Sequence, residues 1–423
     1  NALDGGAARA RGSSRVGSSL LAQTRRPAVT KDECAMTHDF HAQAYALSET
    51  LIARRRDFHQ YPEIAFEEVR TAGIVARTLG ELGLAVRTGV GRTGVVALLE
   101  GAHPGPTVLV RADMDALPIQ EENSFEYASR NPSRMHACGH DGHTSIALGV
   151  AEMLSAHRDS LAGRVKFVFQ PAEEVGRGAQ AMIDDGALDD PRPDVSFGLH
   201  LWNNLSYGTL GIADGSVMAG ASVFTLHVMG KGSHAASPHE GLDPIVCAAH
   251  IVTALQTIVS RSVDPLDTLV ISVTKMHAGE AYNIIPQMAE IAGTVRAYSR
   301  EARDLAFARM ETIAVQIASA FGCTASLSYA HLTIPVVNHA EIAGRMRDLL
   351  KGFPGVSHID SSERTMGSED VSLFMDDIPG VFFFVGARDE TQAEYYGHHH
   401  PRFSFDERAL TLYRRDRIGI VFQ

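Results

Sequence analysis

The sequence has little cysteine, a single tryptophan and no long hydrophobic run. Its 423 residues include four cysteines, namely Cys34, Cys138, Cys247 and Cys323. So few cysteines in so long a chain do not form a dense disulfide framework, so a reducing, cytoplasmic compartment is expected. No uninterrupted run of about 18 apolar residues suggests a membrane span. The remaining composition, 45% hydrophobic and 21% charged, is typical of a folded globular protein.

Basic stretches are also scarce. The chain has 38 Lys and Arg residues against 50 Asp and Glu residues, which gives a formal net charge of -12 at pH 7. A protein of this charge repels a phosphate backbone unless a basic patch offsets it, and the folded part of the chain contains no long basic run. We therefore expect neither nucleic acid nor a membrane as partner, and a small molecule as ligand.

Both ends of the sequence are unusual. Residues 1–35 are rich in Ala, Gly, Ser and Arg but lack the apolar core of a secretory signal. They fit an organellar transit peptide, or extraneous sequence before a true start at Met36, and we favour the second interpretation and expect no ordered structure there. At the other end, Ala409, Leu410 and Tyr413 lie on one face of a predicted helix, but the final "IGIVFQ" does not continue that face. A truncated or altered C-terminus is expected.

Strand-like and helical runs alternate between residues 90 and 215. The strand-like runs are "GVVALLE", "TVLVRAD", "RVKFVFQ" and "VSFGLH", and "HTSIALGVAEMLSAH" is helical. This alternation predicts an α/β domain with a mostly parallel central sheet and helices on both faces. The last 90 residues, with "GVFFFVGA" as another buried strand, return to this domain, so we assign residues 36–217 and 333–423 to it.

The pattern changes in residues 218–332. Long alternating strands, "SVFTLHVMG", "DTLVISVTKMH" and "EIAGTVRAYS", are separated by predicted helices at 244–260 and 301–321. This predicts a two-layer α+β domain inserted into the first one. Asp243 followed by Pro244 is a favourable N-cap and first-turn pair for the first of these helices.

The stretch "HACGHDGHT" concentrates metal-ligating side chains. Cys138 and His140 stand two residues apart, so both can face one ion if the backbone is extended or turns there. A thiolate with imidazoles and carboxylates suits zinc, manganese, cobalt or nickel. Taken alone, the pair fits equally a buried cysteine beside histidines at a helix start.

Other candidate ligands follow predicted strands. Glu173 and Glu174 follow "VKFVFQ", His200 ends "VSFGLH", and "GHHHP" contains three more histidines. Each alone fits a surface or supporting residue. In a parallel sheet, however, strand ends meet at one edge, where five or six ligands can hold two divalent ions. Of two adjacent acids, one can bind metal while the other acts as a base.

The order of motifs from about residue 45 to 410 resembles the M20 metallopeptidases, specifically their amidohydrolase branch. The motifs are "RADMDALP", "HACGHDGHT", "FQPAEE", "GLH", "GKGSHAASPHEGLDPI", "YNIIP", "GTVRAY", "MGSED" and "HHPRF". This branch includes hippurate hydrolase-like, N-acyl-amino-acid and indole-acetyl-amino-acid hydrolases. The resemblance implies a catalytic domain and an inserted lid or dimerisation domain, through which a homodimer or higher oligomer can form, although some relatives act as monomers.

The resemblance also implies a set of site residues. The ligands of two divalent ions would be Cys138, His140, Glu174, His200 and His399, the last chosen because the family pattern H-x-P-x-F begins at that position. Glu173 would be the general base. Asp115 would orient a ligand, although a plain turn carboxylate explains it as well.

Further roles fall on the inserted domain and one loop. The resemblance implies that His234 stabilises the oxyanion in a neighbouring subunit's site and that Asn283 and Arg296 bind the substrate carboxylate. An exposed turn histidine and a surface ion pair are the alternatives for His234 and Arg296. Glu369 lies near the substrate in the family motif, but helix capping after Ser368 also explains it.

The expected function is metal-dependent hydrolysis of the amide bond of N-acyl or N-aroyl amino acids such as hippurate. Short peptides, N-acetyl-diaminopimelate or conjugated auxins are alternative substrates. A homologue that kept the fold and lost catalysis is the rival hypothesis, and it predicts a missing ligand or base. The sequence lacks neither.

Overall fold

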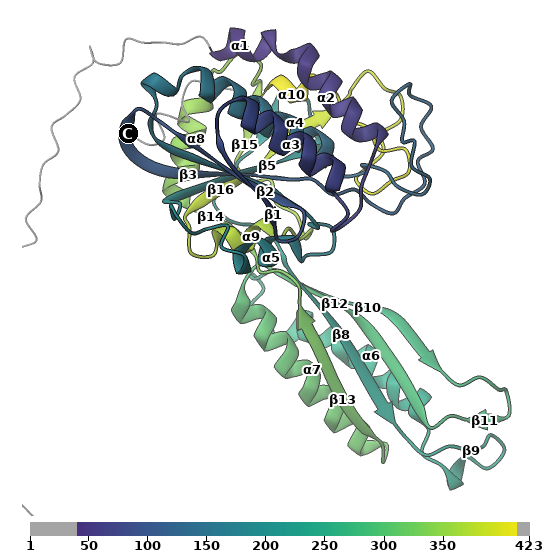
Figure 1. Ribbon diagram of the computed structural model, residues 1–423. Coiled ribbons are helices and arrows are strands. Elements are labelled where there is room, and N and C mark those ends of the chain that lie inside the picture. The colour runs from purple at the N-terminus through teal and green to yellow at the C-terminus, as the bar shows by residue number, and fades with distance from the viewer. Residues whose placement is uncertain (1–39, 413–423) are drawn as a thin grey trace, which may run out of the picture. The chain divides into compact units, whose positions relative to one another are not determined.

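The computed structural model describes residues 40–412. The predictions for residues 1–35, for Met36 as the start and for the chain end from Tyr413 lie outside the described residues. Within them, the backbone forms two layered assemblies, each with a sheet and a hydrophobic core of its own (Figure 1). The first contains the polar clusters noted above, and the second comprises most of the predicted insertion.

An eight-stranded sheet organises the first assembly. In spatial order it consists of β1 (Ala85–Val90), β2 (Gly94–Glu100), β4 (Ala162–Gln170), β3 (His103–Asp113), β5 (Val195–Ser206), β16 (Gly380–Arg388), β6 (Thr209–Gly211) and β15 (His358–Asp360). The central strands β4, β3, β5 and β16 pair in parallel, whereas β1, β2 and β6 join antiparallel. The predicted mostly parallel sheet is confirmed, and its central strands are buried on both sides, as parallel strands require.

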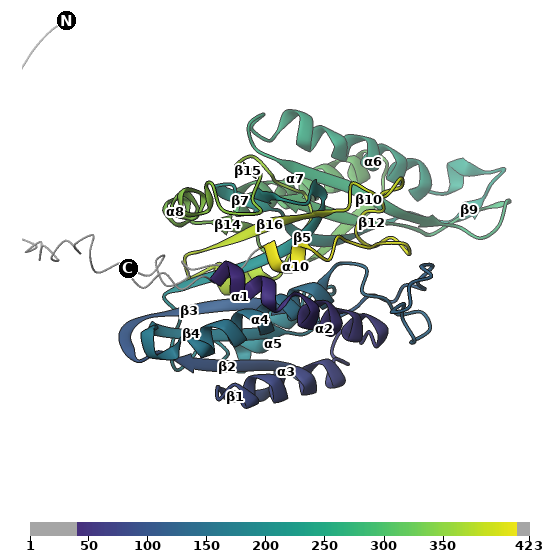
Figure 2. The same cartoon turned by 90° about the horizontal axis from the view of Figure 1, so that it is seen from above.

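Helices cover both faces of this sheet. They are α1 (Phe40–Ala46), α2 (Ser48–Gln60), α3 (Val69–Glu81), α4 (His140–Ala156), α5 (Gly178–Asp184), α8 (Ala340–Leu350), α9 (Val371–Met375) and α10 (Ala409–Leu412), with a 3-10 turn at Arg158–Ser160. Residues of α2, α3, α4 and α8 share one core with the sheet, and residues of α5 and α9 share the core on its other face. Figure 2 shows α3 lying along β1 and β2. The β-strand alternation is visible in β16, where Phe383 faces the first core and Phe382 and Phe384 the second.

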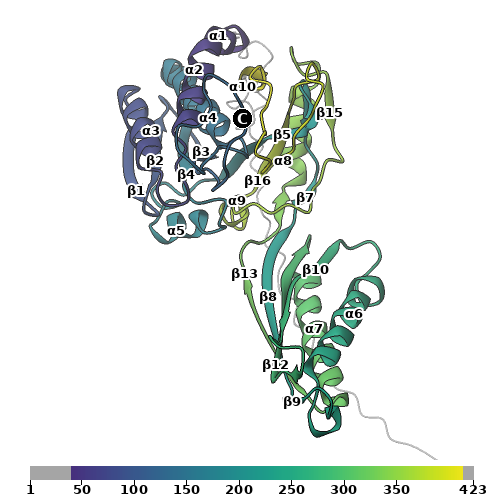
Figure 3. The same cartoon turned by 90° about the vertical axis from the view of Figure 1, so that its right-hand side faces the viewer.

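The second assembly is a four-stranded antiparallel sheet covered on one face by two helices (Figure 3). Its strands, in order, are β10 (Leu269–Ala278), β12 (Met288–Ala297), β8 (Gly220–Met229) and β13 (Thr324–His331), and its helices are α6 (Pro244–Arg261) and α7 (Arg300–Ala320). Short elements complete it and its connections, namely β7 (Gly215–Met218), β9 (Ser233–His234), β11 (Ile284–Ile285), β14 (Val336–Asn338) and a 3-10 turn at Pro238–Glu240. The predicted domain boundaries themselves remain a prediction.

Helix α6 is apolar and long enough to satisfy the length and composition expected of a membrane span, and a third (33%) of its 18-residue window is buried. Its buried residues Cys247, Ile251 and Leu255 pack in the core of the four-stranded assembly, which accounts for part of that composition. The predicted cap is confirmed, because the Asp243 carboxylate accepts hydrogen bonds from the N–H groups of Ile245 and Val246.

Two local expectations were wrong. Strand β5 does not end at His200 but continues to Ser206, because its backbone keeps pairing with β16 as far as Arg388. Ser368 does not cap a helix, since α9 begins at Val371 with Asp370 in the N-cap position and no side-chain cap.

Candidate metal centre

The start of α4 carries the cysteine and two of the histidines into the interior. Gly139 precedes the helix with a φ of 99°, a left-handed conformation that glycine adopts without strain. This turn places Cys138 before the helix and His140 at its first position, and both are buried. A tight turn directly before a helix lets a C-x-H pair face one point.

Ligand atoms from the start of α4, the turn after β4, strand β5 and the loop after β16 converge there. Cys138, His140 and His200 offer atoms within 4.8 Å of one another, and so do Cys138, Glu174 and His399. The two groups share only the Cys138 sulfur. A third group combines His140 with Glu173 and Glu174. A thiolate common to two sets of ligands is the arrangement that suits a bridge between two ions.

The histidine rings are oriented as metal ligands require. His140 Nδ1 donates to the Asp115 carbonyl oxygen at 2.9 Å, while its buried Nε2 has no hydrogen-bond partner. His200 Nδ1 donates to the Leu201 carbonyl oxygen at 2.7 Å, and its Nε2 lies 3.5 Å from the Cys138 sulfur. In each ring the backbone fixes the proton on Nδ1, which leaves the Nε2 lone pair free for an ion. Burial holds the pKa of His200 well below its usual value, so this ring is neutral.

His399 and Glu174 face each other across the centre. His399 Nε2 lies 3.3 Å from Glu174 Oε2, and the other carboxylate oxygen, Oε1, is buried without a partner. Hydrogen bonds with Cys138 and Glu174 raise the pKa of His399 to about 10. The groups that attract a proton to this ring would equally attract a divalent cation. The preceding His398 donates to the Leu201 carbonyl oxygen at 2.9 Å and lies beside Trp202, so it is engaged elsewhere.

The two remaining acids have distinct surroundings. Asp115 accepts the backbone N–H of Glu173 at 3.1 Å and that of Glu174 at 3.0 Å, and its own carbonyl holds His140. Its side chain therefore orients both glutamates. Glu173 is nearly buried, and burial together with Glu369 and Glu174 raises its pKa well above the usual value of a carboxylic acid. A carboxyl group with a raised pKa can take up and release a proton near neutral pH.

Sequence reasoning missed two residues that support this centre. His143 Nδ1 donates to Asp113 Oδ1 at 2.7 Å, while its Nε2 accepts the N–H of Leu201 at 2.9 Å. With both nitrogens engaged, His143 has no lone pair to offer an ion, although its atoms lie close to Asp113 and His140. It instead ties α4 to the backbone beside His200. The available signal was its position three residues after His140, on the same side of a helix.

Glu369 is placed in a buried ionic cluster. Arg111, 3% exposed, donates to Glu369 and Asp113 at 2.7 Å each and to Asp370 at 3.2 Å. The structure brings Glu369 within 4.8 Å of Glu173 but pairs it with Arg111. Its predicted contact with substrate stays a prediction.

The residues predicted in the inserted segment separate into two places. Arg296 lies on β12 opposite Ala221, and its Nη1 donates to Ser368 Oγ at 3.4 Å. Among residues 40–412, no carboxylate pairs with it in an ion pair. Asn283 precedes β11, which pairs with His234, and the Asn283 carbonyl oxygen accepts the N–H of Ala235 at 3.0 Å. Asn283 and exposed His234 therefore lie together.

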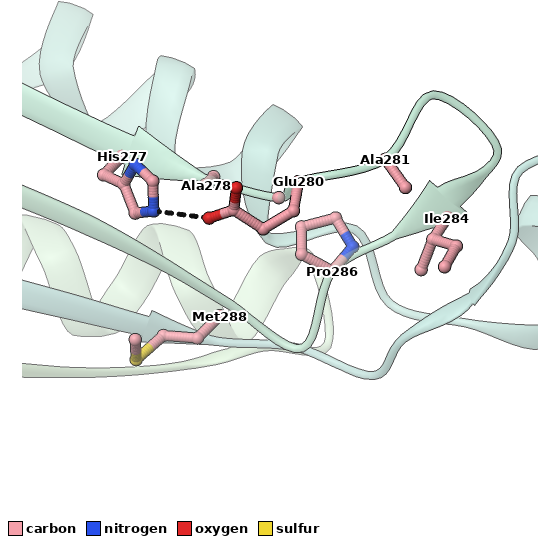
Figure 4. Close-up of a pocket in the computed structure, with 8 residues that line it drawn as sticks. His277, Ala278, Glu280, Ala281, Ile284, Pro286 and Met288 are labelled. Carbon is pink, nitrogen blue, oxygen red and sulfur yellow. Dashed lines mark hydrogen bonds and ion pairs between the residues drawn. The ribbon is translucent and has the colours of Figure 1, made fainter.

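The structure does not bring Asn283 next to Arg296 in one chain. Strand β12 runs from Met288 to Ala297, and Arg296 lies near its far end. The eight residue steps from 288 to 296 span about 27 Å of extended strand. A pocket of about 360 Å³ lies near Asn283, lined by residues such as His277, Glu280 and Met288 (Figure 4). It contains none of the residues of the metal-ligating groups.

A largely parallel α/β sheet that gathers a thiol, imidazoles and carboxyl groups along one edge is the arrangement of a metal-dependent enzyme. The chain belongs to peptidase family M20/M25/M40, whose family model matches residues 109–413. As a member of that family it is a metal-dependent amidohydrolase or peptidase.

Named relatives are similar over most of the chain. N-acetyl-L-cysteine deacetylase of Bacillus subtilis is 40% identical over 86% of this chain and 85% of its own length. N-acyl-L-amino acid amidohydrolase of Geobacillus stearothermophilus is 46% identical over 69% of this chain and 78% of its own. Among solved structures, the YXEP protein of Bacillus subtilis, described as a dinuclear metal-binding peptidase, is 34% identical with a TM-score of 0.77, covering 87% of this chain and 95% of that one.

Proposed function

We propose that this protein hydrolyses the amide bond of N-acyl or N-aroyl amino acids with two divalent metal ions and Glu173 as general base. The observation that carries the proposal is the Cys138 sulfur, which is shared by two ligand groups beside a carboxyl group that belongs to neither. The proposed ligands are Cys138, His140, Glu174, His200 and His399. The cofactors would be manganese, zinc, cobalt or nickel.

The donor set fits such ions on two counts. The buried Nε2 of His140 and Oε1 of Glu174 have no hydrogen-bond partner, and buried polar atoms rarely lack one. Burial raises the pKa of the Cys138 thiol, so the thiolate that the site needs depends on a nearby cation. When bound, divalent ions lower the pKa of water and polarise an amide carbonyl.

The residues of the chain would then divide the remaining work. Glu173 would accept a proton from the attacking water and deliver it to the leaving nitrogen, for which its raised pKa is suited. Asp115 would hold Glu173 and Glu174 in place through their backbone N–H groups. Arg296, half-buried and without an acidic partner in the described part of the chain, supports a substrate that carries a carboxylate.

The test is release of free amino acid from hippurate and a panel of N-acetyl amino acids, with manganese, zinc, cobalt, nickel or no metal. Short dipeptides and N-acetyl-diaminopimelate in the same panel separate the alternative substrates. Metal-dependent release that Glu173→Ala abolishes, with two ions still bound to the variant, supports the proposal. A folded protein with two ions that releases nothing from any substrate supports the catalytically silent alternative. Glu126→Ala, at an exposed site, is the matched control.

We infer further that the small two-stranded sheet of β9 and β11 completes the site of a second subunit in a homodimer. His234 is exposed, and the N–H of Ala236 occupies its Nδ1 at 3.0 Å, so Nε2 can donate a proton outwards. Because Asn283 lies beside this two-stranded sheet and Arg296 at the other end of β12, one carboxylate would meet both only across two chains.

Mixing two inactive variants tests this arrangement. Subunits with Glu173→Ala and subunits with His234→Ala would each form inactive dimers. Random mixing should restore about a quarter of wild-type activity, because half of the dimers are mixed and each has one complete site of two. If His234 serves its own subunit, mixing restores nothing. A cytoplasmic location also belongs to the proposal, and the cysteines of the described residues, Cys138, Cys247 and Cys323, are free thiols.

A further inference from the structure

Glu68 is a fully buried acid outside the metal-ligating groups. Its side chain is 0% exposed, and Oε1 accepts the backbone N–H groups of Phe66 and Ala172, both at 2.9 Å. Oε2 accepts the hydroxyl of Thr93 at 2.5 Å. Burying a carboxylate costs free energy unless hydrogen-bond donors such as these satisfy it, and we therefore ask what Glu68 does at this position.

The role of Glu68 is not to cap its own helix. Glu68 occupies the N-cap position of α3, where a side chain ordinarily accepts the first free N–H groups, but it makes no such bond. Glu63 does so instead, because its carboxylate accepts the N–H groups of Arg70 at 2.9 Å and Thr71 at 2.8 Å. The Glu68 carboxylate is thereby left to reach the turn after β4.

The groups around Glu68 are held in an uncommon backbone conformation. Phe66, Arg92 and Ala172 all have positive φ, at 63°, 80° and 53°. Phe66 and Ala172 donate directly to Glu68, and Arg92 immediately precedes Thr93. A left-handed conformation is unfavourable for residues other than glycine and persists only where the surroundings enforce it. Among residues 40–412, Glu68 is the one side chain hydrogen-bonded to all three segments.

The consequence falls on the two glutamates that follow Ala172. The N–H of Ala172 binds Glu68, while the N–H groups of Glu173 and Glu174 bind Asp115. Three successive backbone donors are thus each held by a buried carboxylate. We propose that Glu68 is a positioning residue, which fixes the left-handed turn at Ala172 and so sets the direction of Glu173 and Glu174. This inference rests on the proposed roles of those two residues.

The variants distinguish positioning from charge and from general stability. Glu68→Gln keeps an oxygen acceptor for both N–H groups and can donate to Thr93, so it should retain the turn. Glu68→Met keeps the length and apolar stem but accepts no hydrogen bond. Glu63→Met is the matched control, since it removes a carboxylate that binds two N–H groups of the same helix without touching the turn.

In the full-length protein, Glu68→Met should lower kcat by about 10- to 100-fold with KM within about twofold, and weaken Mn²⁺ binding to the metal-free protein by about 10-fold. Glu68→Gln and Glu63→Met should stay within about threefold of the wild type in both measurements. Unfolding curves would show that each variant is folded. The substrate is whichever N-acyl amino acid the wild type hydrolyses fastest.

Several results would overturn the inference. One is a folded Glu68→Met with wild-type kcat and Mn²⁺ affinity, and another is a loss as large in Glu63→Met. A Glu68→Gln variant as impaired as Glu68→Met would show that charge, and not orientation, matters. If Glu68→Met does not fold, Thr93→Val removes one of the three hydrogen bonds and should lower kcat by a few fold, and an unchanged kcat would count against the role. A wild type that hydrolyses nothing refutes the proposed function instead, and Mn²⁺ affinity still tests Glu68.

Discussion

The buried ionic cluster around Arg111 allows a quantitative test. Replacing Arg111 by Met keeps most of the side-chain volume but leaves Asp113, Glu369 and Asp370 without their shared cation. Breaking a buried ion pair by removing one partner costs about 3–5 kcal/mol. Because three carboxylates lose their partner, Arg111→Met should lower the free energy of unfolding at pH 7.5 by about 5 kcal/mol or more. Arg164→Met is the control, because its ion pair with Glu100 at 2.7 Å is exposed and worth at most about 1 kcal/mol.

The destabilisation of Arg111→Met should grow as the pH rises. Burial raises the pKa of Asp370 to about 7 even though Arg111 lowers it, so without Arg111 the pKa rises further. The folded variant then binds more protons than the folded wild type, while the unfolded chains differ little. Each extra proton makes the destabilisation grow by about 1.4 kcal/mol per pH unit as pH rises.

Urea unfolding of both variants at pH 5, 6 and 7.5, with metal removed, measures this dependence. The free energy of unfolding of Arg111→Met should approach that of the wild type as the pH falls, while the difference for Arg164→Met stays small throughout. A loss for Arg111→Met that is below about 1 kcal/mol, or equal at all three pH values, would refute the argument from buried unpaired carboxylates.

Three further predictions follow from the site. Added Mn²⁺ should raise the melting temperature of the metal-free protein but raise that of Glu174→Gln much less in thermal scans, because only the folded site binds the ion; equal shifts would exclude Glu174 as a ligand. His143→Phe should lower kcat by about 10-fold through loss of the link from Asp113 to the Leu201 N–H, checked by steady-state kinetics with metal content unchanged. Burial raises the pKa of Glu68 from 4.5 to about 7, so its contribution to stability is complete below 4.5 and is lost as pH rises through 7. In the wild type this makes the free energy of unfolding fall by about 3 kcal/mol between pH 4.5 and 7, and Glu68→Gln should abolish that fall in urea unfolding. An unchanged fall in the variant would contradict the assignment of this pKa to Glu68.

The regular elements were predictable where the local pattern is strong. The run that forms β16 is apolar from Gly380 to Ala387, β4 ends in the largely apolar "FVFQ", and α6 combines a helical pattern with the Asp243 cap. The second half of β5 was missed because "LWNNLS" contains consecutive polar residues. Its extension depends on backbone pairing with β16, a partner almost two hundred residues away, which local pattern does not reveal.

The motifs by themselves indicated which residue types are candidates for the metal centre. Cys138, His140, the two adjacent glutamates and the histidine before His400 stand out because thiol, imidazole and paired carboxyl groups at strand ends are uncommon and chemically specific. The arrangement that orients them needed the tertiary structure. His143, Asp113 and Glu68 act through contacts between distant segments, such as the bond from Ala172 to Glu68.

The sequence thus determined the α/β class, and it predicted the inserted segment and the chemical identity of the candidate donors, since periodicity and motifs are local properties of the chain. Only the tertiary structure decided that the Cys138 sulfur is common to two ligand groups, that Glu369 pairs with Arg111, and that Asn283 and Arg296 lie apart. These relations depend on which strands are neighbours and on which buried charges find partners. Strand order and charge pairing are both decided by packing between segments that lie far apart in the sequence.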